Sequence, residues 1–111
     1  MSDLFITIRN QNDNAMTSIE GVAFVAIIKQ DGSILDRKTV GLRYADAQFP
    51  NLPPGKYTAV AFHQAVNPLE ASETVILAED ELLEVRFIYL EPERQLLKTR
   101  INRFPFDYSK Y

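Results

Sequence analysis

The segment Asn51-Leu-Pro-Pro-Gly-Lys-Tyr57 constrains the fold of this chain more than any other stretch. Pro54 fixes φ near the value that position i+1 of a turn needs, and Gly55 supplies the positive φ that position i+2 of a type II turn demands. Directly after the turn, Val60 and Phe62 alternate with small or polar residues, as they do in a strand. A rigid turn that leads into a core strand predicts a β-domain and carries no information about chemistry.

Length and composition limit the class of protein. The chain has 111 residues, which suits one domain with a single core. It contains no cysteine, so disulfides and thiolate metal sites are excluded. The N-terminus lacks the basic and apolar segments of a signal peptide, and no stretch approaches about 20 apolar residues. We therefore expect a cytoplasmic protein that does not interact with membranes and that uses no cofactor.

The charge of the chain is divided between its two parts. Residues 91–111 hold five basic and three acidic residues, a net charge of +2, whereas residues 1–90 hold seven basic and twelve acidic residues, a net charge of −5. The sequence therefore predicts an acidic body over residues 1–91 and a basic, aromatic C-terminal tail over residues 92–111.

Seven short segments have the composition of strands and are separated by turn signals. Asp31-Gly32 marks a hairpin turn, the unbroken apolar run 22–28 indicates a central strand covered on both faces, and the charged segment 34–40 indicates an edge strand. The fold class that follows is an all-β, seven-stranded antiparallel Greek-key β-sandwich with a C-terminal extension. The predicted strands are 4–9, 22–28, 34–40, 42–49, 56–64, 73–77 and 82–90.

The conformation of the tail stays open at the level of sequence. Pro92 suits the first position of a helix, and Leu97 with Ile101 makes an i, i+4 apolar pair. However, residues 97–104 also partly alternate at a period of two, as a strand does. Helix, strand and disorder all remain compatible with this segment.

The turn and its flanks resemble prealbumin-like β-sandwich domains, which include carboxypeptidase regulatory-like and Cna B-type modules. The matching parts are residues 21–28 with the following hairpin, residues 46–57 with the Leu-Pro-Pro-Gly-x-Tyr turn, and residues 74–87. The similarity covers about residues 4–90, although the short segment 46–49 lacks the usual glycine. It implies a prealbumin- or immunoglobulin-like sandwich and leaves the function unspecified. The residues that it makes structural are Pro53, Pro54, Gly55 and Tyr57.

The sequence offers little catalytic chemistry. His63 is the only histidine, and a strand-end histidine with a hydrogen-bonded ring is favoured over a general base or metal ligand. An enzyme would need His63 joined to a carboxylate such as Glu70 or Glu73 in a pocket. Transthyretin-like hydrolases share the resemblance, but they use several histidines and a C-terminal Tyr-Arg-Gly-Ser motif that this chain lacks. Segments 12–14 and 79–81 are predicted to be solvated turns, so no metal site is expected. Because the catalytic groups are also lacking, we do not expect an enzyme.

The tail is the predicted recognition element. Aromatic residues and arginine are enriched at binding hot spots, and nucleic acid is disfavoured as a partner because the body is acidic. We therefore predict a non-enzymatic module that binds a protein partner or a second copy of itself. In the opposing interpretation, the tail folds back and covers an open sheet edge of its own domain. The candidate partner-binding residues are Arg100, Arg103, Phe104, Phe106, Tyr108 and Tyr111.

Carbohydrate binding is the alternative function. Sugar sites use exposed aromatic platforms, and the chain has no tryptophan. Tyr44 and Tyr57 are the candidate platforms, although the sequence predicts that Tyr57 packs against its turn.

Overall fold

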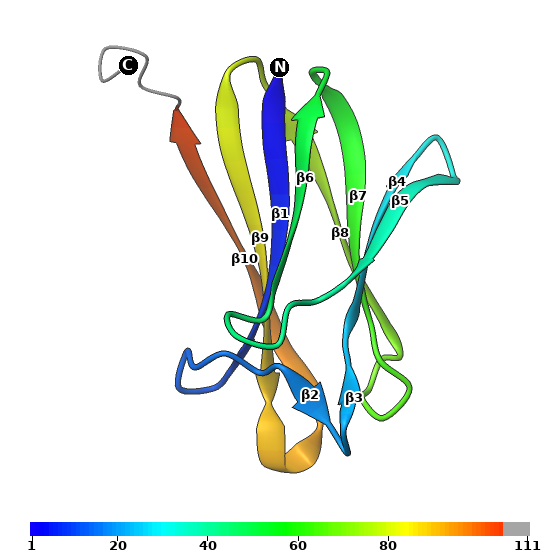
Figure 1. Cartoon of the computed structure of the whole chain (residues 1–111), viewed down its shortest axis with the longest axis vertical. Helices are drawn as coiled ribbons and strands as arrows, with labels where there is room; N and C mark the ends of the chain where they lie inside the picture. The colour runs from blue at the N-terminus through cyan, green and yellow to red at the C-terminus, as the bar shows by residue number, and fades with distance from the viewer. Residues whose placement is uncertain (106–111) are drawn as a thin grey trace.

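Two four-stranded sheets pack face to face and build the domain (Figure 1). The computed structural model describes residues 1–105, and the first sheet has the strand order β10-β9-β1-β6 while the second has the order β5-β4-β7-β8. A short β2-β3 hairpin lies at one end of the sandwich. The strands are β1 (Ser2–Asn10), β2 (Ser18–Ile19), β3 (Val22–Ala23), β4 (Val25–Gln30), β5 (Ser33–Thr39), β6 (Asp46–Leu52), β7 (Gly55–Phe62), β8 (Glu70–Leu77), β9 (Glu81–Leu90) and β10 (Gln95–Pro105).

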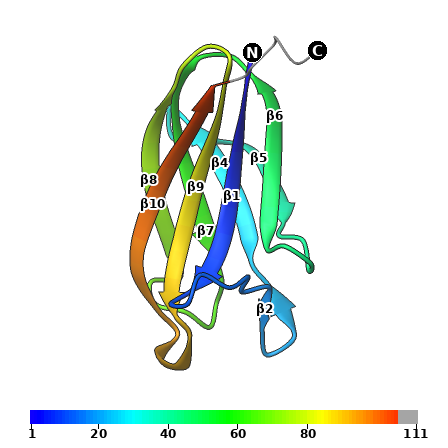
Figure 2. The ribbon, with the colours of Figure 1, turned by 90° about the vertical axis from the view of Figure 1, so that its left-hand side faces the viewer.

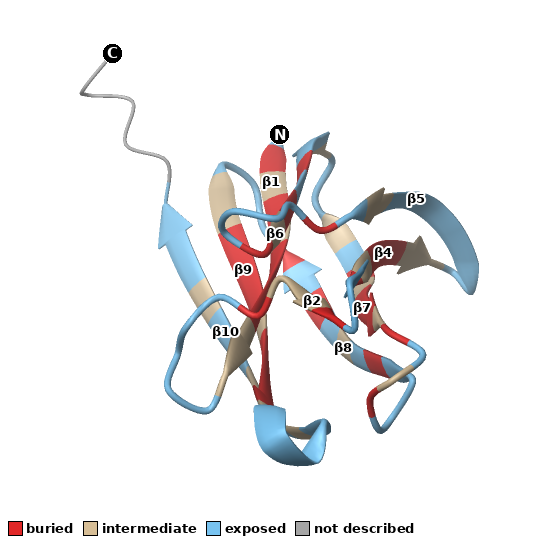
Figure 3. Ribbon diagram, turned by 60° about the horizontal axis from the view of Figure 1, so that its bottom comes forward, coloured by how far each residue is buried: buried red, intermediate tan, exposed pale blue. Residues whose placement is uncertain are grey.

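The core lies between the two sheets because the strands alternate buried and less buried residues. Leu4, Ile6 and Ile8 of β1 are 0% exposed, and every second residue of β9 is buried in the same way. Burying one such side chain contributes about 1.5–3 kcal/mol. Figure 3 shows the result, with buried positions on β1, β7 and β9 and largely exposed ribbons for the edge strands β5 and β10.

The all-β fold and the two-sheet architecture are confirmed, but the number and direction of the strands differ from the prediction. Residues 1–105 contain ten strands rather than seven. The first sheet is mixed because β1 and β9 run parallel, with Leu4 opposite Leu83 and Ile8 opposite Phe87. The reason is that the 78–80 turn returns the chain to the end of the sandwich where β1 begins. Ser2 Oγ donates a hydrogen bond of 2.6 Å to the carbonyl oxygen of Ala78 at that point.

Several strand boundaries were predicted incorrectly. Strand β8 begins at Glu70, three residues before the predicted start. The run 22–28 is interrupted at Phe24, because Glu20 and Gly21 have φ values of 54° and 76° and turn Val22–Ala23 back onto Ser18–Ile19. Residues 40–45 form a turn instead of the start of a strand. In contrast, Asp31-Gly32 is the expected hairpin turn, and the charged strand β5 is an edge, as expected.

The predicted type II turn at Pro54-Gly55 is wrong. Gly55 has a φ of 158°, whereas position i+2 of that turn needs about +80°. The glycine is instead the first residue of β7 and lies opposite Leu77. A side chain is disfavoured there for another reason, since a Cβ at this position would lie 3.3 Å from Gln30 Nε2.

Tyr57 packs against the turn as predicted. Its ring is 1% exposed, and its hydroxyl donates a 2.6 Å hydrogen bond to the carbonyl oxygen of Pro53. The Pro-Pro-Gly segment therefore connects β6 of the first sheet to β7 of the second, and the tyrosine fixes it to the core.

Candidate partner-binding edge

The first part of the C-terminal tail is the edge strand β10. A 3₁₀ turn at Glu91–Glu93 reverses the chain, and β10 then pairs antiparallel with β9 from Gln95↔Leu90 to Pro105↔Glu81. Figure 2 shows β10 at the border of its sheet, with β9 on one side only. The interpretation that the tail covers an edge of its own domain therefore holds for residues 95–105. Covering β9 in this way makes β10 the new edge.

Local contacts explain why this segment is a strand and not a helix. Pro92 lies within the single 3₁₀ turn, and Arg94 takes a left-handed φ of 51°, which ends the turn. Asn67 then holds the start of β10. Its N–H donates to Arg94 O at 2.9 Å, and its carbonyl oxygen accepts from Leu96 N at 2.9 Å. The half-buried Leu96 packs against the core. The period-two alternation then continues along the strand.

The side chains of β10 divide between two faces. Thr99 Oγ1 donates to Glu73 Oε2 of β8 at 3.1 Å, so Thr99 and Ile101 lie on the side of the second sheet. Asn102 Nδ2 donates to Glu84 Oε1 at 2.7 Å, so Asn102, Arg100 and the other even-numbered residues after the bulge lie on the outer face.

Of the predicted partner-binding residues, Arg100, Arg103 and Phe104 lie in β10, while Phe106, Tyr108 and Tyr111 lie outside the described residues. Phe104 is 48% exposed and is joined on the strand by Leu97 at 51% and Ile101 at 38%. Arg103 Nη1 forms a 2.6 Å ion pair with Glu81 Oε1. Strand β10 therefore combines exposed apolar side chains with three cationic residues and contains no acidic residue.

A buried carboxylate, Glu84, fastens the outer face of β10 to β9 and β1, and the sequence analysis missed it. Glu84 is 3% exposed and accepts hydrogen bonds from Thr7 Oγ1 at 2.8 Å and from Asn102 Nδ2 at 2.7 Å. Arg86 donates to both oxygens of Glu84, and its Nη1 also contacts both oxygens of Asp13, at 2.8 and 3.0 Å. The sequence signal that could have revealed it was the pair Glu84 and Arg86, two residues apart in a largely apolar strand.

The charges of this network support one another. Burial lowers the pKa of the Arg86 guanidinium, but the hydrogen bonds and charges of Glu84 and Asp13 outweigh burial and raise it overall. The cation therefore stays charged at any working pH. The hydrogen bonds of Glu84 and Arg86 thus join strands β1, β9 and β10 to the 10–14 loop.

His63 has the structural role that the sequence favoured. The ring is 2% exposed and packs on Phe24, with the ring centroids 4.8 Å apart. Its Nδ1 accepts from the backbone N–H of Ala65 at 3.0 Å, so Nε2 carries the proton and donates to the carbonyl oxygen of Val22 at 2.9 Å. Both ring nitrogens are therefore engaged by the backbone.

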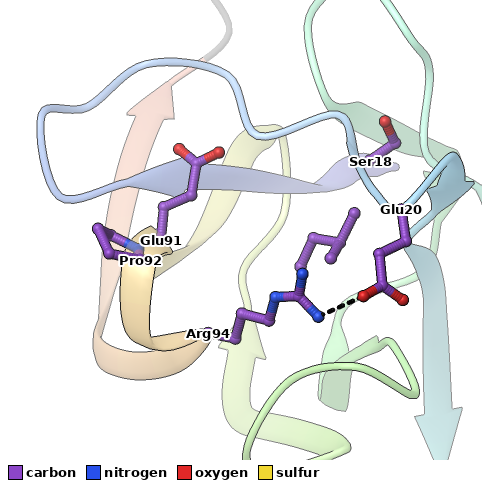
Figure 4. A pocket seen from close by; sticks show the side chains of 6 residues that line it. Ser18, Glu20, Glu91, Pro92 and Arg94 are labelled. Carbon is purple, nitrogen blue, oxygen red and sulfur yellow. Dashed lines mark hydrogen bonds and ion pairs between the residues drawn. The ribbon is translucent and has the colours of Figure 1, made fainter.

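His63 lines none of three open hollows on the surface of the described residues. Figure 4 shows the first, of about 320 Å³, between the β2-β3 hairpin and the 3₁₀ turn. Arg94 Nη1 forms an ion pair with Glu20 Oε1 at 2.8 Å, and the second carboxylate of the lining, Glu91, accepts a 3.0 Å hydrogen bond from Asn10 Nδ2. Among residues 1–105, no group of three or more histidine, cysteine or acidic side chains is arranged to hold a metal ion.

The two tyrosines considered as sugar platforms differ in exposure. The ring of Tyr57 is buried, whereas Tyr44 is 60% exposed with the Arg43 guanidinium 5.3 Å from its ring centroid. Within residues 1–105, no helix is long and apolar enough to cross a membrane.

A scan against protein-family models and a search of curated proteins both found no match to this chain. The fold and the geometry of β10 are therefore the observations on which a function is inferred.

Proposed function

We propose that this protein is a non-enzymatic interaction module and that the free edge of β10 binds an extended segment of a partner protein. The observation that carries the proposal is an eleven-residue edge strand that pairs with β9 on one side only. In an antiparallel pair, every second residue directs its N–H and C=O away from the partner strand. A peptide that adds a strand to the sheet uses these groups for affinity and the alternating side chains for specificity.

The side chains of β10 support the proposal. Leu97, Ile101 and Phe104 offer exposed apolar side chains along this edge, and an added strand could cover them. The engagement of both His63 nitrogens by the backbone supports the non-enzymatic part of the proposal, because it leaves this ring no free nitrogen for proton transfer.

The architecture also supports a proposal about the group of β-sandwich domains to which this one is related. We propose that the sandwich is related to prealbumin-like domains, and the support is the Pro-Pro-Gly-Lys-Tyr connection between the sheets with its buried tyrosine. The parallel β1–β9 pair and the exposed extra strand β10 are compatible with such a domain extended at its C-terminus.

The proposal is tested with the full chain as bait, followed by hydrogen–deuterium exchange on the purified complex. Strand addition predicts slower amide exchange in residues 95–105 of the complex than in the free protein. A variant with Ile101→Thr and Phe104→Thr keeps strand-forming residues and should lose the partner. A partner that binds this variant normally, and that slows exchange only in other segments, would move the interaction away from β10.

Removing the tail is not a clean test. Deleting residues 92–111 also removes Leu96 from the core and Asn102 from Glu84. Loss of binding by the deletion variant could then result from unfolding as well as from lost recognition. Substitutions of exposed side chains are therefore the better test.

A further inference from the structure

The outer face of β10 carries two cations whose charge is not compensated within the described residues. Lys98 and Arg100 form no ion pair with any residue in 1–105, whereas Arg103 pairs with Glu81. Arg100 lies directly opposite Arg86 in the β9–β10 register. Like charges in opposite positions destabilise a sheet. Glu84 and Asp13 offset the charge of Arg86, whereas Arg100 has no ion pair among residues 1–105.

The space beside these cations is open. A hollow of about 200 Å³ lies between β10 and the 10–14 loop, with both Lys98 and Arg100 in its lining. The one carboxylate in that lining, Asp13, is already engaged by Arg86 at 2.8 and 3.0 Å. The apolar side chains Ile88 and Leu97 complete one part of the wall. The two cations are therefore accessible, and the available carboxylate does not neutralise them.

The opposite face of β10 has a different character. Thr99 and Ile101 lie toward the second sheet, where Glu73 of β8 already accepts a hydrogen bond from Thr99. An added strand would place alternate side chains beside these two faces. Next to Ile101 and Glu73, an apolar side chain fits and a further carboxylate would be repelled.

We infer that the segment bound by β10 is acidic on one face and apolar on the other, with carboxylates two residues apart opposite Lys98 and Arg100. The inference rests on the proposed strand addition and specifies its partner. A second copy of β10 does not fit, because β10 carries three cations and no acidic residue, and pairing two copies would bring like charges together. The acidic body of the protein disfavours a nucleic acid.

The test uses the full-length protein and three fluorescein-labelled synthetic peptides of nine residues. The first alternates glutamate with valine, the second replaces every glutamate by glutamine, and the third replaces every glutamate by lysine. Anisotropy measures affinity, and amide exchange of residues 95–105 reports whether the peptide lies along β10. We expect the glutamate peptide to bind at least about tenfold more tightly than the glutamine peptide at low salt, and the lysine peptide not to bind.

Charge-reversal variants localise the effect. Lys98→Glu with Arg100→Glu should weaken the glutamate peptide about tenfold or more and should allow the lysine peptide to bind. The matched control is Lys29→Glu with Lys56→Glu, which makes the same change of charge beside a hollow on the second sheet and should leave affinity unchanged. Thermal unfolding establishes that both variants are folded.

The outcomes separate the inference from the proposed function. Equal binding of the glutamate and glutamine peptides, with slowed exchange in β10, would leave strand addition standing and overturn the acidic partner. Binding of the glutamate peptide without slowed exchange in β10, or no binding of it, would overturn the inference, and the captured natural partner would decide the proposed function. Tighter binding of a single-stranded oligonucleotide, or a dimer of the free protein that Lys98→Glu with Arg100→Glu dissociates, would also overturn it.

Discussion

The hydroxyl group of Tyr89 tests the packing of the core. The side chain is 0% exposed, its ring lies 5.3 Å from that of Phe24, and its hydroxyl has no hydrogen-bond partner among residues 1–105. Burying an unpaired hydroxyl costs about 1–3 kcal/mol, because water no longer solvates it. Tyr89→Phe keeps the ring and removes only the oxygen. We therefore expect the variant to be more stable by about 1–3 kcal/mol.

The size of the change in melting temperature follows from the length of the chain. Unfolding entropy near the midpoint is about 2.1 cal/mol/K per residue, or roughly 0.23 kcal/mol/K for this protein. The gain then corresponds to about 4–13 °C. Tyr44→Phe is the matched control, since that ring is exposed, and it should change neither stability nor midpoint.

The effect should grow at alkaline pH. Burial raises the pKa of the Tyr89 phenol well above the ordinary value of about 10. Below pH 10 the phenol is neutral in both states, and the difference in stability is constant. Above pH 10 the unfolded chain releases a proton that the native state retains, so the wild type loses stability by about 1.4 kcal/mol per pH unit until the native group also ionises. Tyr89→Phe has no proton to release and should not show this loss.

The assay is urea unfolding at 25 °C, at pH 7 and pH 11, for the wild type and three variants. Tyr57→Phe should lose about 1 kcal/mol at pH 7, because it removes the donor to the Pro53 carbonyl. A Tyr89→Phe variant that is less stable than the wild type at pH 7 would refute the reasoning, since it would show that the hydroxyl has a partner. A stability gain that does not grow between pH 7 and pH 11 would refute the pH argument alone.

Three further substitutions test other parts of the structure by the same unfolding assay. Glu84→Leu leaves the Arg86 cation without its buried partner and should lower the free energy of unfolding by about 3 kcal/mol. An unchanged midpoint would show that the network does not stabilise the fold. His63→Phe fills the space but leaves two backbone groups unpaired, with an expected cost of about 2–4 kcal/mol; a neutral result would contradict the assigned tautomer and hydrogen bonds. Gly55→Ala places a side chain at φ 158° close to Gln30 and should cost about 1–3 kcal/mol, whereas a stabilised variant would show that the backbone there is unstrained.

Local signals predicted much of the fold from the sequence alone. The Asp31-Gly32 turn has φ values of 52° and 79°, as a two-residue hairpin of this type requires, so the prediction depended on two residues and no distant contact. The alternation of Leu4, Ile6 and Ile8 likewise identified the core side of β1. Failures occurred where tertiary contacts decide the outcome. The parallel β1–β9 pair depends on which end of the sandwich the 78–80 turn reaches, and no local pattern encodes that choice.

The candidate site was predicted only in part for the same reason. Leu97 and Ile101 satisfy both a helical and a strand pattern, and the free edge of β9 decides in favour of a strand. In the sequence, Glu84 and Arg86 appeared only as two charged residues in a largely apolar strand. Its role emerges only when Thr7, Arg86 and Asn102 are brought around it from three different strands.

This placement gives β10 two separable sets of side chains. Leu96, Asn102 and Arg103 fix the strand to the core, to Glu84 and to Glu81, whereas Lys98 and Arg100 make no ion pair within residues 1–105. Residues that anchor a strand contribute to folding, and residues that remain exposed on it are available for recognition. If both sets served the fold alone, reversing the charge of Lys98 and Arg100 would change stability and binding together. If the exposed set serves recognition, charge reversal alters the choice of partner without lowering the unfolding midpoint, because Arg100→Glu removes the repulsion from Arg86. This separation is what a strand that belongs to both the domain and its interface requires.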